Sequence, residues 1–187
     1  YIGIIKLGIK TSTDDIHGEI LKQQNVPKLS FEELDNSLNS FRGTFQQIPP
    51  QVSSVHIDGE RAYKKSRRKE IFTLPSKEVT IHKLILQNWD QTNGLLNVEI
   101  NCSSGTYIRS LARDLGRLLN SEGCLYDLRR TKASGFAEDK AIDLEHLMIE
   151  KDNINKIINP ISYGLNHLPK IHLIEELDIL YWRTGRQ

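Results

Sequence analysis

The segment LLNVEINCSSGTYIRSLARDLGRLL changes its hydrophobic period once, and this change constrains the fold more than any other feature of the chain. In its first part four side chains alternate with polar ones, which is typical of a strand with one buried face: Leu96, Val98, Ile100 and Cys102. The apolar residues after them recur at helical spacing: Ile108, Leu111, Ala112, Leu115, Leu118 and Leu119. The sequence therefore predicts a strand that passes directly into an amphipathic helix.

Other segments predict strands and helices without a regular alternation of the two. The Ile-rich residues 1–7 and the segment EVTIHKLILQNW predict strands, and QTNG after the latter predicts a hairpin. Ser30 and Glu33 fit a capping box at the start of a helix that Gly43 ends. Antiparallel-looking strands with interspersed helices indicate an α+β fold.

The remaining segments are shorter. QQIPPQVSSVHIDGERAYKKSRRKE predicts a loop, then a short polar strand and a basic segment, because its adjacent prolines exclude a helix. CLYDLRRTKASGF predicts another strand. DLEHLMIEK, with Asp143 as N-cap, and IEELDILYWRTG predict short helices.

Composition and motifs exclude several classes of protein. The 187 residues are 38% hydrophobic and 26% charged, which is typical of a folded globular chain. A net charge of +1 attracts nucleic acid only through local patches. Two cysteines without CxxC spacing favour a reducing compartment, and no run reaches transmembrane length. The six histidines form no HxxxH or Cys/His cluster, and neither GxSxG nor a glycine-rich phosphate loop occurs.

Two basic clusters leave two interpretations open. Five of the six residues from Lys64 to Lys69, KKSRRK, are cationic. They form either a solvated loop or a phosphate contact beside Tyr63, whose ring could stack on a base or a ribose. A second cluster, Arg129, Arg130 and Lys132, makes nucleic-acid binding as favoured as a solvated surface.

Arg109 also has two interpretations. It falls in the first turn of its predicted helix, where the helix dipole disfavours a cation, and Arg113 follows one turn later beside Asp114. One interpretation is a surface arginine paired with a carboxylate, worth at most about 1 kcal/mol. The other is an inward-pointing guanidinium that grips a partly buried carboxylate in a fork and keeps it ionised.

Four stretches in a fixed order carry a resemblance to one family: YIGIIKLGIKTSTDDIHG, QIPPQVSSVHIDGERAYKKSR, CSSGTYIRSLARDLG and LRRTKASGF. Over roughly residues 1–150 the chain resembles the TruB family of tRNA pseudouridine synthases. The resemblance implies that family's α+β catalytic core, with a mixed and largely antiparallel sheet flanked by helices. Residues 1–165 would be part of this catalytic domain, and residues 166–187 the start of a C-terminal RNA-binding domain, for which a PUA-like domain is one candidate.

The resemblance also implies roles for individual residues. Tyr1 would stack on the target base and help to remove a proton, and Arg109 would hold the family's catalytic aspartate. Asp15, Tyr107 and Leu128 would line the substrate pocket. The aspartate belongs to a loop upstream of the tyrosine, outside this chain. The RNA backbone would meet the basic side chains: Lys64, Lys65, Arg67, Arg68, Arg129 and Arg130.

The implied activity is isomerisation of the T-loop uridine of tRNA, position 55, to pseudouridine. The base would be flipped into a pocket, and the reaction would need no cofactor and no metal. The partner would be the T-arm of tRNA, with no membrane, and the protein would be a cytoplasmic monomer. The 187-residue chain alone would lack turnover, since it lacks the aspartate. The competing hypothesis is a non-catalytic RNA-binding module that assists tRNA folding.

Overall fold

The computed structural model describes residues 1–149, 153–166 and 168–185. The chain divides into two compact units, Tyr1–Thr131 and Lys132–Gln187. All residues that are buried in the described part of the chain belong to the first unit. Among the described residues no helix has the length and apolar character that crossing a membrane requires.

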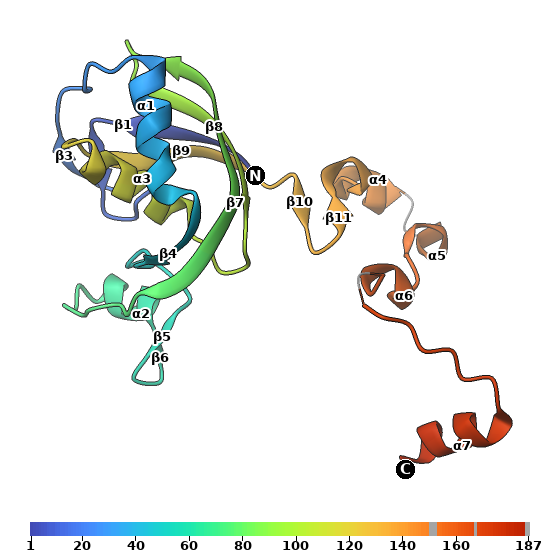
Figure 1. Ribbon diagram of the computed structural model, residues 1–187. Coiled ribbons are helices and arrows are strands. Elements are labelled where there is room, and N and C mark those ends of the chain that lie inside the picture. The colour runs from blue at the N-terminus through green and yellow to red at the C-terminus, as the bar shows by residue number, and fades with distance from the viewer. Residues whose placement is uncertain (150–152, 167, 186–187) are drawn as a thin grey trace. The chain divides into compact units, whose positions relative to one another are not determined.

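Five antiparallel strands form the central sheet of the first unit (Figure 1). Their spatial order is β4 (Gly43–Gln47), β7 (Lys77–Asp90), β8 (Leu95–Cys102), β1 (Ile2–Leu7) and β9 (Gly123–Arg129). The predicted hairpin is confirmed, since residues 91–94 join β7 to β8. Ile2 lies opposite Glu99 on one side and Arg129 on the other, so the start of β1 lies beside the ends of β8 and β9.

Two helices, α1 (Phe31–Leu38) and α3 (Ile108–Leu118), pack against the sheet (Figure 1). Their apolar side chains join those of the strands in one cluster, whose burial is the main favourable contribution to folding. From the strands this cluster takes the side chains predicted to share one face, Leu96, Val98 and Ile100. The α+β prediction is therefore confirmed.

The capping box that starts α1 is confirmed. The Ser30 hydroxyl accepts the Glu33 N–H at 3.2 Å, and the Glu33 carboxylate accepts the Ser30 N–H at 2.8 Å. α1 ends at Leu38, and a 3₁₀ turn, η1 (Asn39–Phe41), follows before Gly43. Gly43 has φ +89°, a conformation that glycine adopts without steric cost.

The passage from strand into helix is confirmed, and α3 lies against β9 at backbone contact distance. A Cβ placed on Gly116 would lie 2.3 Å from the Gly123 nitrogen. A Cβ on Gly123 would lie 2.3 Å from the Ala112 carbonyl oxygen. Two glycines therefore allow the helix to approach the strand that follows it.

Smaller elements surround this core. β2 (Ile9–Thr11) pairs with β3 (Ile20–Gln23), and β5 (His56–Ile57) pairs with β6 (Glu60–Arg61). A helix, α2 (Ala62–Arg67), holds most of the basic segment. The sequence analysis missed β2, β3, β4 and α2. β4 has no clear alternation and exists through its register with β7, in which Gly43 lies opposite Ile81.

The second unit consists of short elements. They are β10 (Lys132–Ala133), β11 (Phe136–Ala137), η2 (Glu138–Lys140), α4 (Leu144–Ile149), α5 (Ile154–Ile157), α6 (Ile161–Gly164) and α7 (Glu176–Thr184). The single strand predicted for CLYDLRRTKASGF is wrong beyond Arg129, because Ser134 and Gly135 turn the chain with φ +49° and +87°.

The predicted helices of this unit correspond to α4 and α7. Asp143 caps the first, since its carboxylate accepts the His146 N–H at 2.7 Å. Residues 150 and 151 of that prediction lie outside the described residues.

Candidate functional site

Gln47, at the end of β4, fixes the start of α3. Its amide oxygen accepts the Tyr107 N–H at 2.9 Å, and its amide nitrogen donates to the Tyr107 carbonyl at 3.1 Å. Gln47 is 2% exposed, so both hydrogen bonds are shielded from water. Tyr107 is the extended N-cap residue of α3. The contact with Gln47 therefore fixes the position of the first turn of the helix, which contains Arg109.

Arg109, the second residue of α3, joins two loops through backbone carbonyls. Its guanidinium donates to the Thr13 oxygen at 3.1 Å and to the Val52 oxygen at 3.0 Å. The side chain is half-buried and makes no ion pair with any carboxylate of the described residues. The interpretation of Arg109 as a surface ion-pair partner is therefore wrong for this part of the chain. Its contact with the family's aspartate stays a prediction.

Tyr1 and Arg130 meet across the sheet. The Tyr1 nitrogen donates to the Ile100 carbonyl at 2.8 Å, which places Tyr1 beside the end of β8. Arg130 Nε donates to the Tyr1 hydroxyl at 3.0 Å, and its guanidinium carbon lies 5.2 Å from the ring centroid. A residue predicted to bind the RNA backbone thus contacts a residue predicted to be catalytic, and the guanidinium is attracted to the face of the ring.

Leu128 and Arg129 lie on β9 at the same end of the sheet. Leu128 is opposite Gly3, and a Cβ on Gly3 would lie 3.5 Å from a Leu128 methyl carbon. Leu128 is 38% exposed, so it presents an accessible apolar surface next to the start of β1. The sheet register thus brings together Tyr1, Leu128, Arg129 and Arg130, which are far apart in the sequence.

Asp15 uses its carboxylate locally. It accepts the His17 N–H at 2.9 Å, and the Asp15 carbonyl accepts the Thr11 hydroxyl at 2.7 Å. The loop around it is held to β9, since Ile16 donates to the Leu125 carbonyl at 2.8 Å. Asp15 therefore orders its own turn in this structure. Its predicted contact with substrate stays a prediction.

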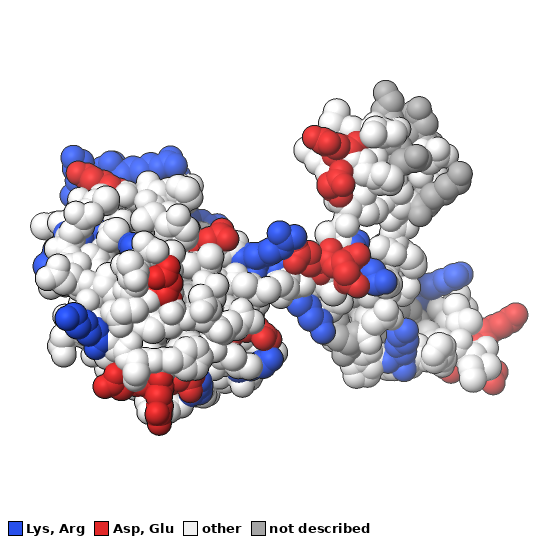
Figure 2. Space-filling model, turned by 90° about the horizontal axis from the view of Figure 1, so that it is seen from above, with Lys and Arg blue, Asp and Glu red and all other residues white. Residues whose placement is uncertain are grey.

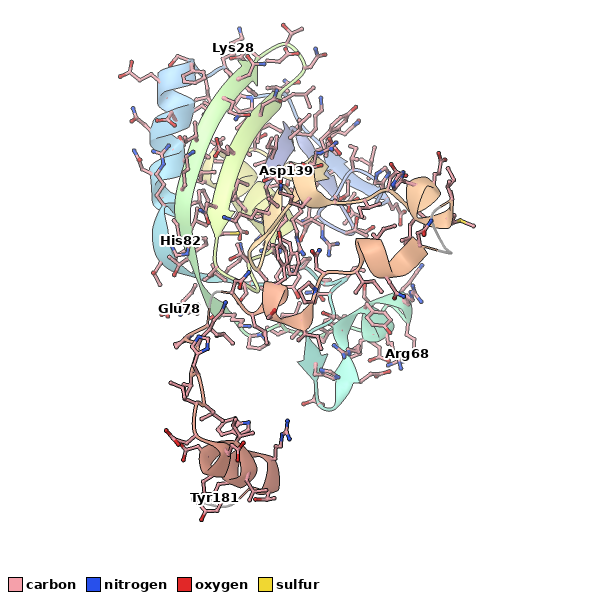
Figure 3. The ribbon with its side chains drawn as sticks, turned by 90° about the vertical axis from the view of Figure 1, so that its right-hand side faces the viewer. Lys28, Arg68, Glu78, His82, Asp139 and Tyr181 are labelled. Carbon is pink, nitrogen blue, oxygen red and sulfur yellow. The ribbon has the colours of Figure 1, made fainter. Side chains whose placement is uncertain are left out.

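The basic segment is partly neutralised by its own neighbours. Arg68 donates to the two Glu60 oxygens at 2.8 and 2.6 Å and to Glu70 at 2.5 Å, and Lys65 lies 3.6 Å from Asp58. These carboxylates raise the pKa of Arg68 further above its usual value. Arg68 directly follows α2 and contacts Glu60 of the β5–β6 hairpin (Figure 3).

Lys64 and Arg67 differ from these two paired cations. Lys64 is exposed, and Arg67 lies over the Tyr63 ring with its guanidinium carbon 5.4 Å from the centroid. Figure 2 shows both basic and acidic side chains on the face seen from above, some of them in small groups of one sign. An RNA contact at α2 would therefore depend on Lys64 and Arg67 more than on the charge of the whole segment.

Sequence reasoning missed Gln47 and the pair formed by Asp14 and Arg113. Arg113 was noted only as a neighbour of Asp114, yet it is buried and contacts Asp14 at 2.8 Å. Burial raises the pKa of Asp14, and the charge of Arg113 opposes that shift. The i, i+4 spacing of Arg109 and Arg113 was the available signal, because it places both on one side of α3.

Metal-binding groups and surface depressions were the other candidates for a site. The described residues contain no group of three or more His, Cys, Asp or Glu side chains that could hold a metal ion. An open depression of about 800 Å³ lies at the far end of β1 from Tyr1, lined by Lys6, Gly8, Gln24, Val26 and Asn120 among others. The depression is not lined by Tyr1 or Arg109.

Comparison with solved structures supports the fold. A crystal structure of a Cbf5-Nop10-Gar1 complex contains a chain that aligns with a TM-score of 0.63 and 19% identity, over 91% of this chain and 44% of that one. A structure of an H/ACA RNP bound to a substrate RNA containing 2'-deoxyuridine aligns with a TM-score of 0.58 and 16% identity, over 90% of this chain and 41% of that one. At these identities the likeness concerns the fold alone.

Curated relatives are much more similar in sequence. A tRNA pseudouridine synthase B of Prochlorococcus marinus strain MIT 9301 is 55% identical over 186 residues, covering 100% of this chain and 61% of the relative. One from Synechococcus sp. strain CC9311 is 51% identical over 189 residues, covering 63% of the relative. The chain thus spans less than two thirds of the length of these relatives.

Family descriptions match consecutive parts of the chain. Residues 109–166 match the tRNA pseudouridylate synthase B C-terminal domain. Residues 1–108, more than half of the chain, match the N-terminal domain of the TruB family pseudouridylate synthases. Together with the sheet that gathers Tyr1, Leu128 and Arg130, these matches show that the chain belongs to the TruB family of pseudouridylate synthases.

Proposed function

We propose that the whole polypeptide isomerises the T-loop uridine of tRNA, position 55, to pseudouridine. The observation that carries this proposal is the convergence of Tyr1, Leu128 and Arg130 at one end of the sheet, in a chain of the TruB family. An aromatic ring, an accessible leucine and a guanidinium at one place suit an unstacked base attached to a phosphate backbone.

The reaction detaches uracil from its ribose, turns the base and rejoins it through carbon. Atoms balance within the nucleoside, so the reaction needs no redox partner, no water and no cofactor. It needs an ionised carboxylate near the ribose, and in this family that aspartate belongs to a loop upstream of the tyrosine. Arg109 would hold it ionised, because a neighbouring cation lowers the pKa of a carboxyl group.

The geometry of Arg109 is compatible with this role. A guanidinium has five N–H donors, and two of them bind the Thr13 and Val52 carbonyls. The other donors can meet a carboxylate while these two hold the group in place. A preorganised donor of this kind stabilises charge without rearranging during the reaction.

The substrate would be held by its backbone and read mainly by shape. Tyr1 and Tyr107 are the proposed aromatic faces for the flipped base, and Leu128 is the apolar wall. The basic side chains of α2 and of residues 129–130 would contact phosphates of the T-arm, which predicts salt-dependent binding. We assign the protein a cytoplasmic location and a monomeric state as parts of the same proposal.

The test is incubation of the full-length polypeptide with an unmodified tRNA transcript, followed by mapping of pseudouridine. The expected product is pseudouridine at the T-loop uridine, with none formed by the 187-residue chain alone. Absence of product at that position with the full-length protein would overturn the proposal. Product from the 187-residue chain would refute the role given to the upstream aspartate.

A second candidate is a tRNA-folding module, favoured by the exposed Lys64 and by Arg67 over Tyr63. The discriminating variant replaces the upstream aspartate in the full-length protein. If that variant still accelerates folding of a misfolded tRNA, the protein has this second activity. If it does not, the basic segment serves only to bind the substrate of the isomerisation.

A further inference from the structure

Two arginines one helical turn apart on α3 reach the same two loops. The first loop, residues 12–18, follows β2, and the second, residues 48–53, follows β4. Arg109 donates to carbonyls of Thr13 and Val52. Arg113 donates to the Asp14 carboxylate and to the Ile48 carbonyl, both at 2.8 Å. We call this set of four contacts the two-loop clamp.

Arg113 is the buried half of the two-loop clamp. Its side chain is 9% exposed and that of Asp14 is 13% exposed. Asp114 completes its surroundings, accepting from Nε at 2.9 Å and from Nη2 at 3.0 Å. A buried guanidinium surrounded in this way has one orientation, because any rotation would leave a donor or a carboxylate unpaired.

Further hydrogen bonds hold the backbone of each loop at the residue that Arg113 contacts. Leu125 of β9 donates to the Asp14 carbonyl at 3.0 Å, and Asp14 has φ +59°, a conformation that aspartate and asparagine tolerate. Ser110 of α3 also donates to the Ile48 carbonyl, at 2.8 Å. Pro49 and Pro50 then restrict the backbone between Ile48 and Val52.

The acceptors of Arg109 are therefore coupled to the contacts of Arg113. Thr13 is adjacent to Asp14, and Val52 is separated from Ile48 by a stiff segment. A shift of either loop would move a carbonyl that binds Arg109. Displacements of about 1 Å in a catalytic group can lower a rate by about 10²-fold.

We propose that Arg113 is a positioning residue, whose pairing with Asp14 sets the spacing of the two loops and thereby aims the Arg109 guanidinium. This inference rests on the proposed function, in which Arg109 holds the catalytic carboxylate. It assigns Arg113 no contact with substrate.

The test uses the full-length protein with Arg113→Gln and Asp14→Asn, and Arg117→Gln as the matched control. Arg117 lies on the same helix, is 56% exposed and is 3.3 Å from Asp114. We expect Arg113→Gln to lower kcat by about 30-fold, on the scale of such displacements, with less than about 3-fold change in the Kd for tRNA. Asp14→Asn should act in the same direction but more weakly, because Asp114 still neutralises Arg113. Arg117→Gln should change neither quantity by more than about 2-fold.

A merely structural role would give a different pattern. In an Arg109→Lys background, Arg113→Gln should have less than about 3-fold further effect on kcat, because the group that it aims is already lost. An equal loss of kcat in both backgrounds would overturn the inference. The inference would also be overturned if the loss of kcat in Arg113→Gln were fully accounted for by the fraction of the protein that is unfolded. The isosteric Asp14→Asn variant keeps the test valid if Arg113→Gln does not fold.

Hydrogen exchange separates this inference from the proposed function. Amides of residues 12–18 and 48–53 should exchange at least about 10-fold faster in Arg113→Gln than in Arg117→Gln. Unchanged exchange at both loops would refute the two-loop clamp even if the wild-type protein is active. Absence of wild-type turnover together with faster exchange would instead refute the function assigned to Arg109.

Discussion

Arg109 and Arg113 of α3 contrast with Arg67 and Arg68 of the basic segment in the groups that they contact. Arg109 and Arg113 donate to backbone carbonyls and to a buried carboxylate, all within the fold. Arg67 lies over a tyrosine ring, and Arg68 pairs with the exposed Glu70 and the partly exposed Glu60. The first two therefore have one geometry set by the protein, whereas the other two are exposed and, under the proposed function, would exchange their present partners for phosphates.

This difference separates two uses of one side chain. A guanidinium whose position must be accurate is held by loops and helix together, as in the two-loop clamp. A guanidinium that meets a flexible phosphate backbone stays at the surface, where exposed ion pairs are weak, about 0.2–1 kcal/mol, and exchange easily. Position in the fold thus distinguishes Arg109 and Arg113, proposed for catalysis and for positioning, from Arg67 and Arg68, proposed for binding.

Arg109→Lys in the full-length protein should show the largest effect. Lysine keeps the charge but cannot bind the Thr13 and Val52 carbonyls and a carboxylate together. We expect kcat to fall by about 10²-fold or more, with less than about 3-fold change in the Kd for tRNA. The control is Arg67→Lys, which should leave kcat nearly unchanged. Equal losses of rate and affinity for Arg109→Lys would mean that Arg109 is only a phosphate contact.

Gln47→Ala tests whether α3 depends on its buried anchor. The substitution leaves the Tyr107 N–H and carbonyl without their amide partner in a buried site. We expect the free energy of unfolding to fall by about 2–3 kcal/mol, measured by chemical denaturation. Gln46→Ala on the same strand is the control, since Gln46 is exposed, and should cost no more than about 0.5 kcal/mol. Similar values for the two variants would show that water replaces the lost bonds.

The α2 side of the comparison is tested by salt dependence. Arg67→Gln should lower the slope of log Kd for tRNA against log salt by about one, as expected for one phosphate contact. Arg68→Gln should lower it less, because Glu60 and Glu70 occupy the donors of Arg68 and would first have to be displaced. If the slope fell equally in Arg67→Gln and Arg68→Gln, Arg68 would have to leave its carboxylates when the protein binds RNA.

Local periodicity predicted the parts of the fold that local patterns determine. The Ser30 capping box, the β7–β8 hairpin and the start of α3 each depend on residues close together in the sequence, and each is confirmed. β4 was missed because only its pairing with β7 makes it a strand. α2 was missed because its charged residues carry no apolar period.

The prediction of contacts between site residues was limited in the same way. The family resemblance named Arg109, but no local pattern indicates that its acceptors are the carbonyls of Thr13 and Val52. The Asp14–Arg113 ion pair joins residues that are 99 positions apart. The contact of Arg130 with Tyr1 likewise depends on β1 lying beside β9. Contacts of this kind follow from sheet order, which periodicity does not give.

The smallest expected effect concerns the two free cysteines, which report on the two ends of the sheet. Cys124 of β9 is buried, and burial, with Asp15 and Asp14 adding to it, raises the pKa of its thiol to about 11. Cys102 is half-buried, and its pKa is also raised by burial, although Thr106 and Arg130 oppose the shift. Since the thiolate is the reactive form, iodoacetamide at pH 8 should alkylate Cys102 first and Cys124 only after unfolding.

The raised pKa of Cys124 also determines how its contribution to the stability of the fold changes with pH. A thiol whose pKa is higher in the folded than in the unfolded protein, here about 11 against 9.0, stabilises the fold below pH 9. That contribution is lost as the pH rises through about 11, so wild type should lose stability relative to Cys124→Ala over this interval. If the loops of the two-loop clamp cover Cys124, Arg113→Gln should speed its alkylation in native protein, and Arg117→Gln should not. Equal alkylation rates in these two variants would mean that the core alone protects the thiol.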